Sequence, residues 1–208
     1  MTGPRDGIAA DRVAIVTGGS RGIGRATIER LASCGYAVVV DYLHDQRAAE
    51  ATVDAVLAVR GAAVAVRADA ADDLDVQRLF AETVAAFGGV DVVVHAVADR
   101  IDRRSTLIID REAARRVRNG GAIVNLLSSA HGVDADGRAA SDVLTRALAV
   151  ELGVRDITVN AVSLAADGPC LPALIADMVV YLLSDEGRGL TGRVIRIDAG
   201  DRLGLAHR

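Results

Sequence analysis

The chain has 208 residues, a formal net charge of −4, and 24 basic residues that are all arginine, because the sequence contains no lysine. This length suits one domain with a sizeable core, and the acidic balance argues against nucleic acid or a membrane as a partner. Cys34 and Cys170 lie far apart without metal-ligand spacing, so we expect free thiols, a reducing compartment and no metal site.

Residues 1–11 are rich in glycine, proline and charge, and we expect a flexible N-terminal arm there. Residues 12–208 are expected to form one domain. No secretory signal opens the sequence, and no apolar run reaches the ~18 residues that a membrane span needs. These features predict a cytoplasmic protein.

Short Val/Ile-rich runs alternate with helical patterns along the rest of the chain. Strands are predicted at 13–17, 37–41, 63–67, 90–95, 122–127, 157–162 and 194–197. Helices are predicted at 22–33, 46–59, 73–87, 105–117, 139–153 and 171–184, with Gly35, Gly61, Gly88 and Gly120 ending helices in a left-handed conformation. The strand runs lack polar alternation, which indicates burial on both faces. We therefore predict a single-domain α/β Rossmann fold, a doubly wound parallel sheet of about seven strands with helices on both faces.

Residues 17–24, TGGSRGIG, lie between the first predicted strand and the first predicted helix. A strand that reverses tightly into a helix needs glycine where the backbone turns and where a pyrophosphate approaches. The helix N-terminus then offers free N–H groups and a positive dipole end to the anion. The predicted contacts in this turn are Gly18, Ser20, Arg21, Gly22, Ile23 and Gly24. The next strand ends at Asp41 and Tyr42, about twenty residues on, where the ribose of a dinucleotide would lie.

In these features the chain resembles the short-chain dehydrogenase/reductase family, in particular its ketoacyl-reductase-like branch. Four stretches carry the resemblance: 17–24, 67–70 (RADA), 123–129 (IVNLLSS) and 190–198 (LTGRVIRID). They span nearly the whole chain. The resemblance implies an oxidoreductase that binds NAD(P)(H) and reduces a small carbonyl or related substrate by hydride transfer.

The resemblance also assigns residues to the adenosine end of the cofactor. The side chain that matches Asp69 hydrogen-bonds the adenine in the family, with Ala70 beside it; the alternative is a solvated carboxylate at a strand end. The segment 95–98 is expected to pass along the adenine ribose, through Ala96, Val97 and Ala98. The family usually reads Asn-Asn-Ala-Gly there, so Ala98 stands where glycine normally allows close approach.

Two residues bear on the choice between NADP and NAD. Arg21 can pair with a 2′-phosphate, which suits the planar guanidinium. Asp41 argues the other way, because a carboxylate at the strand end would repel that phosphate and accept from a ribose hydroxyl. Aligned with the family, the discriminating position is Tyr42, which carries no charge. NADP(H) is therefore favoured over NAD.

The catalytic end departs from the family. Family members use a tyrosine as proton donor, a lysine four residues later that lowers its pKa, a serine that orients the carbonyl and an asparagine that holds a relay water. The serine matches Ser129, for which the alternative is an ordinary hydroxyl at a strand end. The tyrosine and lysine positions fall on Asp134 and Arg138, and the asparagine position falls on Asp102.

An arginine four residues from Asp134 favours the ionised carboxylate, which is a poor acid. The alternative for Asp134 and Arg138 is an ion pair that opens a helix. His131 is another candidate acid, since imidazole titrates near neutral pH, although a loop histidine without a role fits equally well.

The resemblance further indicates shortened segments on the catalytic side, between Ser129 and Asp134, before the helix at 105–117 and after Val162. Three functions stay open: an oxidoreductase with an atypical active site, a dinucleotide-binding partner or sensor without turnover, and a scaffold for non-redox chemistry such as dehydration or cyclisation. The family pairs the helices that match 105–117 and 139–153, which predicts a homodimer or homotetramer.

Overall fold

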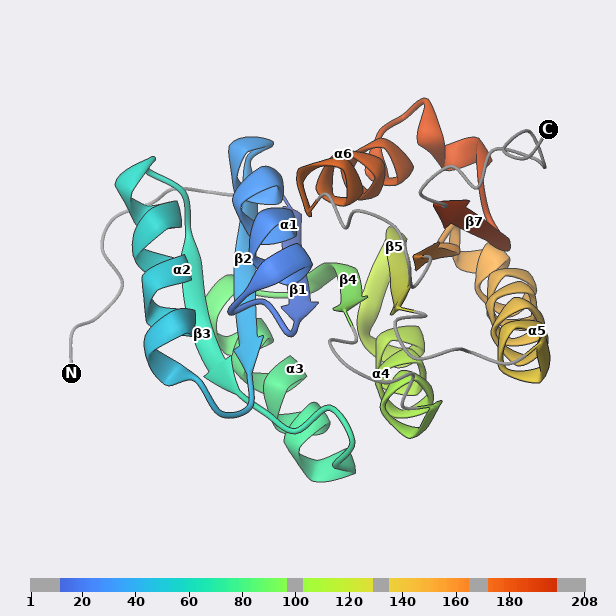
Figure 1. The fold of residues 1–208 in the computed structure, drawn as a ribbon, viewed down its shortest axis with the longest axis horizontal. Coiled ribbons are helices and arrows are strands. Elements are labelled where there is room, and N and C mark those ends of the chain that lie inside the picture. The colour runs from blue at the N-terminus through green and yellow to red at the C-terminus, as the bar shows by residue number, and fades with distance from the viewer. Residues whose placement is uncertain (1–11, 97–102, 129–134, 165–171, 198–208) are drawn as a thin grey trace, which may run out of the picture.

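The computed structural model describes residues 12–96, 103–128, 135–164 and 172–197 (Figure 1). Its strands are β1 (Arg12–Thr17), β2 (Tyr36–Tyr42), β3 (Ala63–Arg67), β4 (Val90–Ala96), β5 (Val117–Ser128), β6 (Thr158–Leu164) and β7 (Arg193–Ile197). Its α-helices are α1 (Gly22–Ser33), α2 (Gln46–Ala58), α3 (Asp73–Phe87), α4 (Arg103–Arg116), α5 (Ala135–Leu152) and α6 (Pro172–Leu183). Every predicted strand and helix is present, and the largest shift is at β5, which begins at Val117 instead of residue 122.

The strands form one parallel sheet in the order β3-β2-β1-β4-β5-β6-β7. After β3 the chain crosses back to place β4 beside β1, so the direction of winding reverses between β1 and β4. Ligands in sheets of this kind bind outside the carboxyl ends of the strands at that reversal. The predicted seven-stranded doubly wound fold is confirmed.

Each face of the sheet is covered by three helices. Helices α1, α2 and α6 pack on one face, and Figure 1 shows α1 beside α6. Helices α3, α4 and α5 pack on the other face, over an apolar row that runs in register across five strands. That row is Val39, Ile15, Val93, Ile123 and Val159. None of the helices in the described ranges is long and apolar enough to cross a membrane.

Two of the four glycines that were predicted to end helices, Gly61 and Gly120, do not do so. Gly35 and Gly88 have positive φ as expected, but at the end of α2 the left-handed residue is Arg60, with φ 61°. Gly61 serves close packing instead, because a Cβ there would lie 2.6 Å from Val56 Cγ1. Gly120 has φ 77° but lies inside β5, since that strand follows α4 directly.

A buried polar pair joins α4 to β5. Asp110 is 2% exposed, and the Asn125 side-chain amide donates to both of its carboxyl oxygens at 3.1 Å. Burial raises the pKa of Asp110 to about 7, and the hydrogen bond from Asn125 opposes this only in part. The Asn125 Oδ1 atom has no hydrogen-bond partner within the described ranges. Burial therefore favours the neutral acid, while the two hydrogen bonds from the Asn125 amide favour the carboxylate.

We predict that Asp110→Asn makes the protein less sensitive to rising pH. The folded state holds a proton on Asp110 up to about pH 7, whereas the unfolded chain loses it near the ordinary pKa of 3.8. Stability from this group is therefore present below that lower value and is lost as the pH rises through about 7. Urea denaturation should show the variant gaining on the wild type between pH 5 and pH 8, by about 3 kcal/mol.

Asp185→Asn, which changes an exposed carboxylate, serves as the control and should follow the wild type. Equal pH dependence of Asp110→Asn and the wild type would show that Asp110 is ionised in the folded protein.

Candidate cofactor site

The turn between β1 and α1 packs closely against β4 and against the start of its own helix. Gly18 has φ 63°, and a Cβ there would lie 2.8 Å from the Ala96 carbonyl oxygen. A Cβ on Gly24 would lie 2.3 Å from the Gly18 carbonyl oxygen. The N–H of Gly19 donates to the Asp41 carbonyl at 3.0 Å, which ties the turn to β2. Any side chain at these glycines would force the turn away from the edge of the sheet.

The N-terminus of α1 is left open by the side chains around it. Arg21, at the N-cap, makes no side-chain capping bond, and the first turn carries no acidic residue. By contrast, α2 and α3 begin with Asp45 and Asp72, whose carboxylates accept backbone N–H groups. Gly22 has φ 54°, and no described atom lies within 4 Å of the position its Cβ would take. Open space in front of uncapped N–H groups fits an anion such as the pyrophosphate of a dinucleotide.

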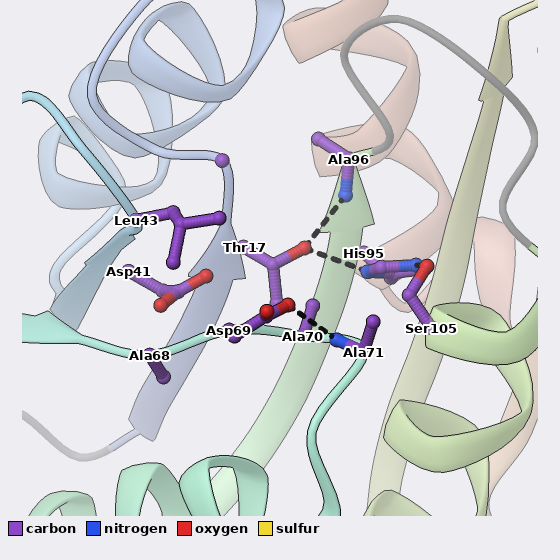
Figure 2. A pocket seen from close by; sticks show the side chains of 11 residues that line it. Thr17, Asp41, Leu43, Ala68, Asp69, Ala70, Ala71, His95, Ala96 and Ser105 are labelled. Atoms are coloured by element: carbon purple, nitrogen blue, oxygen red, sulfur yellow. Dashed lines mark hydrogen bonds between the residues drawn. The ribbon is translucent and has the colours of Figure 1, made fainter.

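Next to this turn, a cavity of about 220 Å³ lies at the carboxyl ends of β1 to β4 (Figure 2). It is lined by Thr17, Gly18, Asp41, Leu43, Ala68, Asp69, Ala70, Ala71, His95, Ala96 and Ser105. Most of the lining is small and apolar, with a few polar groups. Such a surface is typical of a small-molecule site.

The polar groups belong to one row of the sheet. Two residues after the apolar row described above, the in-register positions are Asp41, Thr17, His95 and Asn125, on the face covered by α3 to α5. Each is at most 3% exposed. The sheet therefore changes from apolar to polar at its carboxyl edge, where the cavity begins.

His95 connects the cofactor turn to α4. Its Nδ1 lies 2.7 Å from the Thr17 hydroxyl, and its Nε2 lies 3.3 Å from the Ser105 hydroxyl. The Thr17 oxygen also accepts the Ala96 N–H at 3.1 Å, and Figure 2 shows these groups side by side. The floor of the cavity is thus a hydrogen-bonded chain from β1 through β4 to α4.

Asp41 is the buried carboxyl of this cavity, at 3% exposure. Burial raises its pKa to about 7; the backbone N–H groups of Gly18 and Ala68 lower it in part, and the Asp69 and Asp75 carboxylates raise it further. Its Oδ1 atom has no hydrogen-bond partner within the described part of the chain. The sequence predicted an ionised carboxylate at an open strand end, whereas the structure places a buried acid that titrates near neutrality.

Asp69 lies on the cavity wall and is half-buried. One of its carboxyl oxygens accepts the Ala71 N–H at 2.9 Å, and its own N–H donates to Asp75 at 2.9 Å. These bonds fix the loop after β3. The other carboxyl oxygen has no hydrogen-bond partner in the described part of the chain.

Some of the predicted cofactor contacts line the cavity. These are Gly18, Asp41, Asp69, Ala70 and Ala96.

Others lie around the α1 N-terminus or away from the cavity. The side chains of Ile23 and Tyr42 pack against the apolar cluster beneath α1 and α2, so Ile23 has only its backbone to offer a ligand. Arg21 is exposed, with its guanidinium 3.9 Å from Asp45. The Ser20 carbonyl accepts the Thr52 hydroxyl at 3.4 Å. Val97 and Ala98 lie outside the described residues.

Six residues that line the cavity were not among the named contacts, although two of them belong to the segments 17–24 and 95–98 that the sequence assigned to the cofactor. The six are Thr17, Leu43, Ala68, Ala71, His95 and Ser105. A usable signal was present for two of them: Thr17 and His95 are polar residues at the ends of otherwise apolar strand runs, and neighbouring parallel strands place such ends together. Ser105 carried no comparable signal.

The predicted catalytic residues belong to segments that the structure does not describe in full. Ser129, His131, Asp134 and Asp102 lie outside the described residues. Arg138 lies within α5, on a part of the helix for which only the backbone is described. Their catalytic roles stay predictions.

Comparison with known proteins gives the family. A family model described as short chain dehydrogenase matches residues 12–117. Versicolorin reductase 1 of Aspergillus parasiticus is 30% identical, with 91% of this chain and 95% of that protein covered. A hydroxynaphthalene reductase-like protein of Metarhizium majus is 35% identical over 74% of this chain and 67% of its own length. The alignment with the first relative extends over 250 positions, more than the 208 residues of this chain, so that relative has residues where this chain has none.

Solved structures agree with this result. A dehydrogenase/reductase from Sinorhizobium meliloti superposes with a TM-score of 0.81 at 31% identity, covering 92% of this chain and 95% of that one. A short-chain dehydrogenase from Burkholderia cenocepacia, solved in complex with NADP, gives 0.79 at 30% identity, covering 92% and 98%. The predicted resemblance is confirmed: this chain belongs to the short-chain dehydrogenase/reductase family of NAD(P)-dependent oxidoreductases.

Proposed function

We propose that this chain is an NADP(H)-dependent reductase of small carbonyl or related compounds that works with an atypical active site. The observation that supports this most strongly is the uncapped N-terminus of α1, opened by Gly22, beside a cavity at the reversal point of the sheet. This arrangement fits a diphosphate and an adenosine joined together.

In the proposed complex, the backbone of the turn from Gly18 to Gly24 holds the diphosphate. Ser20 and Arg21 lie at its outer side. Asp69 and Ala70 hold the adenine, and Ala96 with the segment that follows it lies along the ribose. The bound cofactor supplies the hydride, and the chain's part at this end is to position the nucleotide.

NADP(H) is the cofactor we propose over NAD(H). The Arg21 side chain is 75% exposed at the mouth of the site, and its ion pair with Asp45 is long, so it can turn to a 2′-phosphate. Tyr42 adds no negative charge there. One of the similar solved structures is a complex with NADP.

At the catalytic end we propose Ser129 as the group that orients the carbonyl. The proton comes from water or from His131, since the positions of the family's tyrosine, lysine and asparagine hold Asp134, Arg138 and Asp102. General acid help typically contributes ~10²–10⁴-fold, so reduction can continue without the tyrosine. Quinones, which need little protonation, suit such a site best.

We also propose that the protein acts in the cytoplasm as a homodimer or homotetramer. Pairing across α4 and α5 fits the exposed apolar side chains on these helices, Leu107, Val143 and Val150. No described group of His, Cys, Asp and Glu side chains is arranged to hold a metal ion.

Substitution of Gly22 should remove cofactor binding. Gly22→Val places a branched side chain in the open space before α1 and strains a left-handed backbone, so NADPH affinity should fall at least tenfold. Gly35→Val is the matched control, because Gly35 also has positive φ (87°) and an open Cβ position, but at the amino end of β2. Fluorescence titration with NADPH measures the affinity of both variants. Equal affinity in the Gly22 variant and the wild type would contradict the proposed site.

Removal of the Arg21 charge should separate the two cofactors. Arg21→Gln should weaken the binding of NADPH about tenfold and leave the binding of NADH nearly unchanged, since only NADPH carries the phosphate that the guanidinium pairs with. Dissociation constants for both nucleotides, measured at low and at high salt, test this. The same loss for both would place Arg21 at the diphosphate instead.

Removal of the Ser129 hydroxyl should slow turnover. Ser129→Ala is expected to lower kcat for ketones by roughly tenfold or more, the low end of what a positioned polar group contributes. Steady-state rates with a panel of ketones and quinones, including a naphthalene-type carbonyl, measure it. Tight NADPH binding with no oxidation by any acceptor would favour a non-catalytic partner or sensor, and product formation without cofactor oxidation would favour non-redox chemistry.

A further inference from the structure

Asp41 differs from the other carboxyls near the cofactor cavity. Among the described residues that line the cavity, the carboxyls are Asp41 and Asp69, and only Asp41 is buried. It ends the polar row of the sheet, next to Thr17 and beneath the Gly18 turn. Its Oδ1 atom lacks a hydrogen-bond partner among the described residues, so a donor on a ligand would complete its bonding.

The charges around Asp41 are mostly negative. Asp69 faces it from the loop after β3, and Asp75 faces it from α3. From β4 the neighbouring titratable group is His95, which is bonded to Thr17 and Ser105. No arginine is among the described residues that line the cavity.

Two described arginines lie near the cavity without lining it. The Arg67 guanidinium donates to the Leu43 carbonyl on the exposed side of β3, and Arg21 pairs with Asp45 beyond the turn. The surroundings therefore favour the neutral acid, and backbone N–H groups alone support the anion. A pKa of about 7 is the result.

We propose that the proton on Asp41 selects the cofactor: the neutral acid admits NADPH, and the carboxylate favours NADH. The proposal rests on the proposed function and adds a residue that determines specificity. An ionised Asp41 would accept from the free 2′-hydroxyl of NADH and repel the 2′-phosphate of NADPH. A neutral Asp41 does not repel the phosphate, and the ion pair between the phosphate and Arg21 then favours NADPH.

The sign of the pH effect distinguishes this proposal from the titration of the nucleotide itself. A phosphate monoester has a second pKa of about 6, so rising pH gives it more charge for Arg21 to bind. That effect alone would lower the ratio of the dissociation constants of NADPH and NADH as the pH rises. Titration of Asp41 raises the same ratio.

The test is fluorescence titration of the full-length protein with NADPH and with NADH between pH 5.5 and pH 8.5. We expect the ratio of dissociation constants, NADPH over NADH, to rise by about tenfold in the wild type, of the order given by one unit charge at this range in a partly buried site. In Asp41→Asn the ratio should stay flat or fall. Asp54→Asn removes an exposed carboxylate on the outer side of α2 and should follow the wild type.

Each outcome has a distinct meaning. If neither nucleotide binds at any pH, the proposed function fails. If both nucleotides bind and the wild-type ratio of dissociation constants stays flat or falls as the pH rises, the inference about Asp41 is overturned while the proposed function stands. The same holds if the ratio in Asp41→Asn rises as it does in the wild type. If Asp41→Asn does not fold, as judged by circular dichroism, the sign of the wild-type ratio still decides.

Discussion

The close approach of the β1–α1 turn to the end of β4 is the contact on which the rest of the site depends. The Gly18 carbonyl fills the space where a Gly24 side chain would stand, and the Ala96 carbonyl fills the space beside Gly18. With backbone packed on backbone, no side chain caps α1, and its N–H groups face open space. The same contact brings Thr17 to His95 and so fixes the floor of the cavity. A single steric requirement thus produces both the anion site and the pocket beside it.

The polar row at the carboxyl edge of the sheet is less favourable for the stability of the fold than the apolar row beside it. The in-register row Val39, Ile15, Val93, Ile123 and Val159 is aliphatic, and burying it stabilises the fold. At the carboxyl edge the same register holds Asp41, Thr17, His95 and Asn125, and burying these groups is unfavourable unless they are hydrogen-bonded. Two of their oxygens lack partners in the described part of the chain. Of the two residues, Asp41 lines the cavity, so its oxygen is the one that a ligand can satisfy.

The sequence predicted the elements well because their signals are local. Val/Ile runs without alternation, glycine after helices and aspartate before them are all read within a few residues. The cavity was predicted only in part, since its membership is a matter of tertiary contact. Ser105 comes ten residues after His95 and reaches it only because α4 packs back on β4. Asp41 looked like an open strand end, but it is buried and accepts hydrogen bonds from the backbone N–H groups of Gly18 and Ala68, which come from two other segments of the chain.

The lack of lysine has a structural counterpart at the opposite edge of the sheet. Arg118 donates to the Gly88 carbonyl at 2.7 Å, and Arg188 donates to the Gly120 carbonyl at 2.8 Å and to Asp156. Arg155 bonds several backbone carbonyl oxygens and Asn119 at once. Holding several acceptors in fixed directions suits the forked guanidinium better than an ammonium group.

Arginine in this chain thus fastens loops at the amino edge, while the cavity at the carboxyl edge is lined by carboxyls and an imidazole. A guanidinium keeps its charge at every accessible pH and cannot exchange a proton with substrate. If Arg138 stands where the family has its lysine, as we propose, it can stabilise a neighbouring negative charge but cannot relay a proton. The proton for carbonyl reduction then has to come from His131 or from water, as proposed above.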